Sequence, residues 1–245
     1  MRRLLVSTIA MLAASLTACS AHDVRQQDDG TPGIAAKGSG GERHYAVANF
    51  DRVALGAAGD VEVHTGQAFG LTVTGDPADL DRLKVTVNGS TLGLGRKSGS
   101  WHDAGKIHWT VTMPRIVGAD IGGSGAVRVD RAEGDAFSGN IGGSGEISVA
   151  AMKVGKADFN IGGSGNIAAA GSADDLNLAI GGSGKLLAKP LTAQTADITI
   201  AGAGTIEATV KKTADVTILG SGDVTVEGGA KCSVTKMGGG TVHCG

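Results

Sequence analysis

Ile121-Gly122-Gly123-Ser124-Gly125 is the stretch of sequence that decides the fold, because close copies of it recur through the C-terminal half of the chain. The copies begin at Ile121, Ile141, Ile161, Ile180, Ile200, Ile218 and Met237, with spacings of 20, 20, 19, 20, 18 and 19 residues. An earlier relative, residues 55–61, keeps the same order of apolar, small and apolar positions. A fixed period near 20 residues indicates a repeat architecture in which each repeat packs on the next.

Apolar residues alternate with other residues on both sides of the motif. Leu176, Leu178 and Ile180 lead into one copy, and Ile147 and Val149 follow another. A period of two is that of a β-strand with one buried face. Two short strands joined by a Gly-rich bend cannot bury that face alone, whereas parallel stacking of successive repeats builds a continuous core. We therefore predict an all-β fold, a right-handed parallel β-helix (β-solenoid) with about 20 residues per rung.

The motif glycines and serines are predicted to form the corner of each rung, where the chain needs positive φ or a close approach between rungs. These corner residues are Gly122, Gly123, Ser124, Gly142, Gly143, Ser144, Gly162, Gly163, Ser164, Gly181, Gly182 and Ser183. A catalytic serine does not recur in every repeat, so no active site is predicted there. Calcium-binding nonapeptide repeats also begin Gly-Gly-x-Gly, but they have a period of nine. The motif is therefore not read as a metal site.

A column of Asp158, Asn177, Asp197 and Asp215 lies three residues before the motif isoleucines. It is predicted to face solvent. Stacked like charges repel at this spacing, so weak cation binding along the column is an alternative.

The first residues are typical of a signal peptide, predicted to span residues 1–18. Arg2 and Arg3 precede an apolar stretch from Leu4 to Leu16 that is too short to span a membrane comfortably. The run 16–19 (Leu-Thr-Ala-Cys) resembles a lipobox, in which cleavage leaves Cys19 to receive the lipid. Ser20 follows it, a pattern that resembles release to the outer membrane, facing the periplasm or the cell surface. Residues 19–44 are polar and predict a flexible tether, and residues 45–245 are predicted to form the solenoid.

The composition excludes several classes of protein. The 42 glycines occur with only four prolines, which excludes collagen. The net charge is −2 with no basic patch, so no nucleic-acid partner is expected. Residues 50–114 are less regular, and they predict opening rungs that also cap the N-terminal end. Within them, Pro77 to Leu83 is expected to form a helical turn.

Two small groups of residues are candidates for sites. Cys232 and Cys244 predict a disulfide that staples the C-terminus in an oxidising compartment, while zinc would need more ligands than these two and nearby His243. Trp101, His102, His108 and Trp109 suggest either a sugar-stacking loop or, as the preferred reading, a loop that covers the solenoid. No cofactor is predicted.

The lipobox, the tether, the stretches 50–53 (Phe-Asp-Arg-Val) and 113–116 (Met-Pro-Arg-Ile) and the tandem repeats together resemble a known bacterial family. It is the "putative auto-transporter adhesin, head GIN domain" family, formerly a domain of unknown function, and the resemblance covers roughly residues 45–245. It implies a right-handed β-helix at the cell envelope and supplies no catalytic residues. We expect a structural, adhesive or interaction role without catalysis, with an envelope protein or a polysaccharide as partner. The alternative is a polysaccharide-binding or polysaccharide-degrading β-helix. The oligomeric state is left open.

Overall fold

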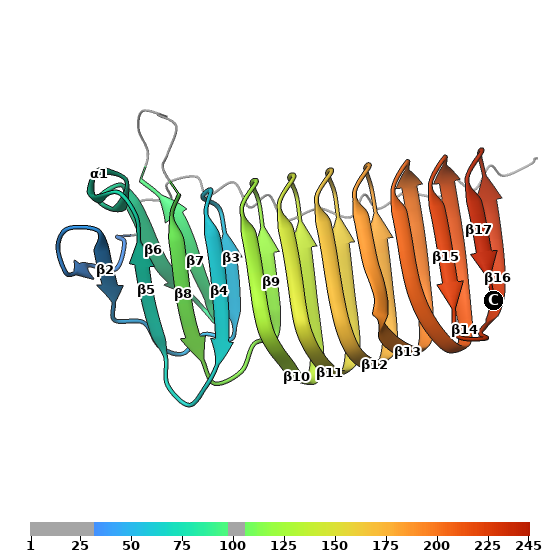
Figure 1. The fold of residues 1–245 in the computed structure, drawn as a ribbon, viewed down its shortest axis with the longest axis horizontal. Helices are drawn as coiled ribbons and strands as arrows, with labels where there is room; N and C mark the ends of the chain where they lie inside the picture. Colours follow the sequence, from blue (N-terminus) through green and yellow to red (C-terminus); the bar gives the residue numbers. More distant parts are fainter. Residues whose placement is uncertain (1–31, 98–105) are drawn as a thin grey trace, which may run out of the picture.

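The computed structural model describes residues 32–97 and 106–245, which form one sheet of 17 strands and a single four-residue helix. Figure 1 shows the strands stacked along one long axis. The N-terminal elements are β1 (Ala36–Lys37), β2 (Glu42–Tyr45), β3 (Arg52–Leu55), β4 (Asp60–Thr65), β5 (Gly70–Thr74), α1 (Pro77–Leu80), β6 (Leu83–Asn88), β7 (Thr91–Arg96) and β8 (His108–Met113). The repeats contain β9 (Gly118–Ile121), β10 (Ala126–Ile141), β11 (Glu146–Ile161), β12 (Asn166–Ile180), β13 (Lys185–Gly202), β14 (Thr205–Gly220), β15 (Asp223–Glu227), β16 (Lys231–Met237) and β17 (Thr241–Cys244).

Successive repeats pair in parallel, one rung apart. Val127 of β10 lies opposite Ile147 of β11, and Ile147 lies opposite Ile167 of β12. The same column continues through Leu186, Ile206, Val224 and Val242. All but the last are buried, so the columns of aliphatic side chains form the core. The predicted β-solenoid with about 20 residues per rung is confirmed.

Each full rung differs in one detail from the prediction of two short strands. A single strand of 15 to 18 residues, such as β11, runs from one glycine corner to the next. The strand bends midway, at the end of the rung opposite the glycine corner (Figure 1). Neighbouring rungs bend at the same place, with Glu133 opposite Lys153 and Gly134 opposite Val154. The pairing of β10 with β11 therefore keeps its register through the bend. In the next three pairs the register shifts near this bend, for example between Val149 and Met152 of β11.

The N-terminal rungs do not follow the order of the chain. Leu55 of β3 lies between Leu94 of β7 and Ile121 of β9. Thus the rung of β3 and β4 is inserted between the rung of β7 and β8 and the rung that begins with β9. The pairing of Leu55 with Ile121 also confirms that residues 55–61 are an early copy of the repeat.

Antiparallel strands cover the N-terminal end, as the irregular sequence there predicted. β6 pairs with β7, β5 pairs with β8, and β2 pairs with β5. The expected helical turn is α1, and Asp76 caps it by accepting a hydrogen bond from the Ala78 amide at 2.9 Å.

The folded domain begins earlier than the predicted boundary at residue 45. β1 pairs with β2 inside the stretch expected to be tether, and the Ile34 amide donates to the Val85 carbonyl at 2.8 Å. These contacts are made by the backbone, so they need no apolar periodicity in the sequence.

The last rung shows a correction to the predicted repeat. The copy predicted to begin at Met237 begins one residue earlier, because Lys236 lies opposite Ile218 in the column of motif isoleucines. Its Nζ donates to the Gly240 carbonyl at 2.9 Å. A charge thus replaces the motif isoleucine at this inward position, while Val234 and Met237 of the same strand remain exposed.

Candidate functional site

The glycine corners lie where the sequence placed them, stacked along one edge of the solenoid. The Ser144 amide donates to the Gly123 carbonyl at 3.1 Å, and the Ser164 amide donates to the Gly143 carbonyl at 3.0 Å. A Cβ on Gly143 would collide with the Gly123 carbonyl, whereas one on Gly142 would have its nearest neighbour at 3.9 Å. These amides and carbonyls bond to the adjacent rung, which leaves them unavailable as a ligand cradle.

Of the predicted loop of tryptophans and histidines, the structure describes His108 and Trp109. Trp109 is fully buried in β8, between Val61 and the outer strand β5, so a role for Trp109 in stacking on a sugar is wrong. Its indole fills the core of the rung formed by β7 and β8. It belongs to the buried column that continues through Val61 and Val127. Among the described residues its Nε1 has no hydrogen-bond partner. His108 is exposed, with its Nδ1 3.9 Å from Asp60 Oδ2. Trp101 and His102 lie outside the described residues.

Two columns of short polar side chains line the layer that leads into each corner; we call this surface the polar face. Its members include Asp120, Asn140 and Asn160 in one column and Ser138, Asp158, Asn177, Asp197 and Asp215 in the other. The predicted stacking of Asp158, Asn177, Asp197 and Asp215 is confirmed by the register.

Hydrogen bonds run along these columns from rung to rung. Asn140 Nδ2 donates to Asp120 Oδ1 at 2.6 Å, and Asn177 Nδ2 donates to Asp158 Oδ1 at 2.6 Å. Lys156 also lies beside Asp158, with Nζ 3.3 Å from Oδ1. Amides and an ammonium group thus separate several of the carboxylates. Within residues 32–97 and 106–245 no three His, Cys, Asp or Glu side chains are placed to share a metal ion.

One cavity, with a volume of about 360 Å³, lies at the capped end. Its lining residues are Gly33, Ile34, Ala35, Ala36, Arg43, Tyr45, Leu80, Asp81, Leu83, Lys84 and Lys97. Arg43 Nη2 donates to Asp81 Oδ1 at 2.8 Å, and Lys97 Nζ donates to the Asp81 carbonyl at 2.8 Å. Burial raises the pKa of the Tyr45 phenol above its usual value of 10, against a smaller lowering by Arg43.

The smaller cavity, of about 220 Å³, is lined by Asn49, Phe50, Asp51, Phe69, Ser90, Pro114 and Arg115. The rings of Phe50 and Phe69 are tilted, with centroids 5.0 Å apart. Arg115 Nη2 donates to Asp51 Oδ2 at 3.2 Å. Both cavities join segments that are far apart in the chain, so no spacing in the sequence indicated either of them.

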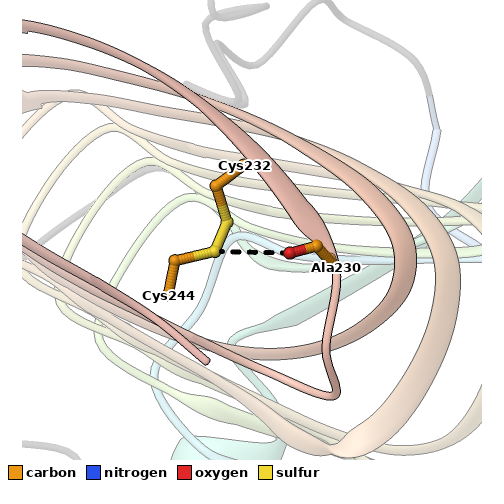
Figure 2. The surroundings of a disulfide bond; sticks show 3 residues. All are labelled: Ala230, Cys232 and Cys244. Carbon is orange, nitrogen blue, oxygen red and sulfur yellow. Dashed lines mark hydrogen bonds between the residues drawn. A yellow bond between two sulfur atoms is a disulfide. The ribbon is translucent and has the colours of Figure 1, made fainter.

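The disulfide between Cys232 and Cys244 is present and joins β16 to β17 (Figure 2). The two Cα atoms are 6.5 Å apart, and Cys244 Sγ lies 3.8 Å from the Ala230 carbonyl oxygen. The bond therefore closes the last rung, as the predicted terminal staple.

The described part of the chain contains no helix of the length and apolar character needed to span a membrane. The predicted signal peptide and Cys19 lie outside it.

Several solved structures have a similar fold. A "putative adhesin" from Bacteroides fragilis has a TM-score of 0.77 and 23% identity, with 82% of this chain and 95% of that chain covered. A "putative lipid binding protein" from Parabacteroides distasonis has a TM-score of 0.69 and 23% identity, covering 85% and 97%. A "putative adhesin" from Parabacteroides merdae has a TM-score of 0.67 and 18% identity, covering 85% and 99%. At these identities the likeness concerns the fold.

No curated protein matches the sequence. A family model does match, over residues 49–230, which include the inserted rung, the cap strands β5 and β6 and all but the last repeat. The region that the family model matches contains the stacked glycine corners from Gly122 to Gly222. The chain belongs to the family described as "putative auto-transporter adhesin, head GIN domain".

Proposed function

We propose that the protein is a non-catalytic lipoprotein of the outer membrane, held by a lipid on Cys19, whose solenoid makes adhesive or structural contacts. The family membership and the adhesin descriptions of solved relatives support this proposal. The observation that carries it is the polar face, which repeats Asp, Asn and Ser side chains at one position on successive rungs. Many equal weak contacts can sum to strong binding of a protein or polysaccharide that is itself repetitive.

The anchor is tested by metabolic labelling with a palmitate analogue, followed by fractionation of the envelope. The wild-type chain should carry label and enter the outer-membrane fraction. Cys19→Ala should lose both. Retention of Cys19→Ala in that fraction would contradict the lipid anchor. Protease digestion of whole cells then distinguishes a surface position from a periplasmic one.

The adhesive role is tested in a deletion strain complemented with surface variants. Asp197→Lys with Asp215→Lys changes the polar face, and Glu146→Lys with Glu207→Lys makes the same charge change on the opposite layer. We expect the first pair alone to reduce adhesion and crosslinking to envelope partners. Wild-type behaviour of the deletion strain, together with no crosslinked partner, would refute the role.

The smaller cavity favours a second candidate, polysaccharide binding. Phe69 is half-buried against Phe50, and Asp51, Arg115 and Asn49 offer polar groups beside it. An apolar ring face with planar polar side chains at its edge suits a sugar ring. Phe69→Ala should abolish retention on polysaccharide gels, whereas Leu187→Ala, an exposed apolar residue on another rung, should not. Equal retention of both variants would exclude this cavity.

A further inference from the structure

The two ends of the solenoid, which lie at opposite ends of its long axis (Figure 1), are finished differently. Within the described residues β16 pairs only with β14, and β17 pairs only with β15. One edge of each strand therefore carries backbone N–H and C=O groups that no described strand takes up. At the N-terminal end, the outermost strand β1 has only two residues, and residues 33 and 34 run beside β6. A free strand edge is a template for pairing with a further strand, so the C-terminal end is the one open to a partner.

The core is also open at the C-terminal end. Val234 of β16 lies opposite Val216, which is 1% exposed, yet Val234 itself is 45% exposed. Met237 is 65% exposed, and Val242 of β17 is only partly buried. One more strand on β16 would give Val234 the surroundings that Val216 already has. Burial of these side chains would favour association.

A partner that covers this end must meet both layers at once, with two strands about 10 Å apart. The same end of a second copy presents two strands at that separation. The disulfide between Cys232 and Cys244 ties β16 to β17, so both layers are fixed before a partner arrives. Such preorganisation lowers the entropy that binding costs.

The size of the end fits a weak dimer. The last rung, residues 226–245, offers at most about 20 residues, and stable protein–protein interfaces use about 20–30 residues a side. We expect a dissociation constant in the micromolar range. Because the N-terminal ends are covered, two copies joined in this way form a closed dimer and not a filament.

We propose that the C-terminal end binds the same end of a second copy, with β16 pairing antiparallel to β16 of the partner subunit. A two-fold axis across the end gives this direction. In the register that places Val234 opposite Val234 of the partner subunit, Ser233 lies opposite Thr235 of the partner subunit. The two copies of Lys236 are then four residues apart along the strands, about 13 Å, so the like charges do not meet.

This dimer has a consequence for adhesion that rests on the proposed function. The chain enters the solenoid at the capped end, where residue 33 lies beside Lys84 and Val85. With lipids on Cys19, the two anchors of the dimer would therefore lie at its far ends. The dimer would link two facing membranes and not two neighbours in one membrane. Dimerisation itself does not depend on the anchor.

Sedimentation velocity of the unlipidated chain from Ser20, which keeps every described element, tests the dimer. The chain should show a monomer–dimer equilibrium without larger species. Val234→Glu should weaken dimerisation about tenfold or more, because it buries a charge at the interface. Leu187→Glu makes the same kind of change at an exposed apolar residue of another rung and should leave it unchanged. Circular dichroism establishes that each variant is folded. A wild-type chain that stays monomeric at millimolar concentration, or equal weakening by both substitutions, overturns the proposal.

A charge exchange tests the register. Ser233→Glu with Thr235→Glu places like charges opposite each other across the two-fold axis, and Ser233→Lys with Thr235→Lys does the same with the other sign. Each variant alone should dimerise about tenfold more weakly than the wild type, and a mixture of the two should form heterodimers at least as well as the wild type. A mixture that associates no better than its components rejects the pairing of β16 with β16. Palmitate labelling of Cys19 is unaffected by any of these results, so it reports on the proposed anchor separately.

Discussion

At the scale of single residues, the corner glycines differ sharply from one another. Gly143 faces the carbonyl of Gly123 across the rungs, while Gly142 points away from its neighbours. We expect Gly143→Ala to lower the free energy of unfolding by about 1–3 kcal/mol, because the added methyl group must push two rungs apart. Gly142→Ala should change it by less than about 0.5 kcal/mol. Urea denaturation of both variants measures this, and equal losses would show that rung contact is not the cause.

Tyr45 is the one tyrosine in the chain, so its ionisation can be followed alone. Burial raises its pKa, and the neutral phenol is therefore favoured in the folded state. A raised folded pKa gives stability that is complete below pH 10 and is lost as pH rises through the folded value. Absorbance at 295 nm should show a midpoint above 10 for the folded protein and near 10 in urea. A midpoint at or below 10 in the folded protein would contradict the burial.

At the scale of elements, the last rung depends on its disulfide. The bond closes a loop between residues 12 apart, which should contribute about 3 kcal/mol by constraining the unfolded chain. In Cys232→Ser with Cys244→Ser we expect hydrogen-exchange protection to fall in β16 and β17 and to persist in β11 and β12, since each rung contacts only its neighbours. Uniform loss along the whole solenoid would instead indicate a fully cooperative unit.

The sequence predicted the repeats well because each strand pairs with the equivalent residues of the next copy. Ile147 meets Ile167 simply because both hold the same place in the period. At the capped end the paired strands are not copies of a repeat, so their partners cannot be inferred from a period. Its antiparallel pairs join segments such as 42–45 and 71–74, and nothing in the local pattern indicates that contact. For the same reason the sequence predicted neither cavity. It also predicted Trp109 to lie in a surface loop, whereas Trp109 lies in the core.

At the scale of the whole molecule, the solenoid should tolerate removal of a complete rung. Deletion of residues 142–161 joins Ile141 to Gly162, and the columns on either side keep their register. We expect a folded protein that is shorter by about 4.8 Å, the spacing of neighbouring strands. Small-angle scattering gives the length. Deletion of residues 142–151, half a rung, is the control. It should prevent folding because it moves each later glycine corner to the opposite end of the rung, away from the corner at Gly122 and Gly123.

The inserted rung of β3 and β4 has a consequence for the order in which the protein folds. Its neighbours on both sides, β7 with β8 and β9 with β10, come later in the chain. During synthesis from the N-terminus, the rung of β3 and β4 cannot pair on both sides until about residue 129 has been made. After that point, each further stretch of about 20 residues can pair with the exposed edge of a rung that is already folded. The N-terminal end is thus the slow nucleus, and the repeats can add to it one rung at a time, in the direction in which the chain emerges.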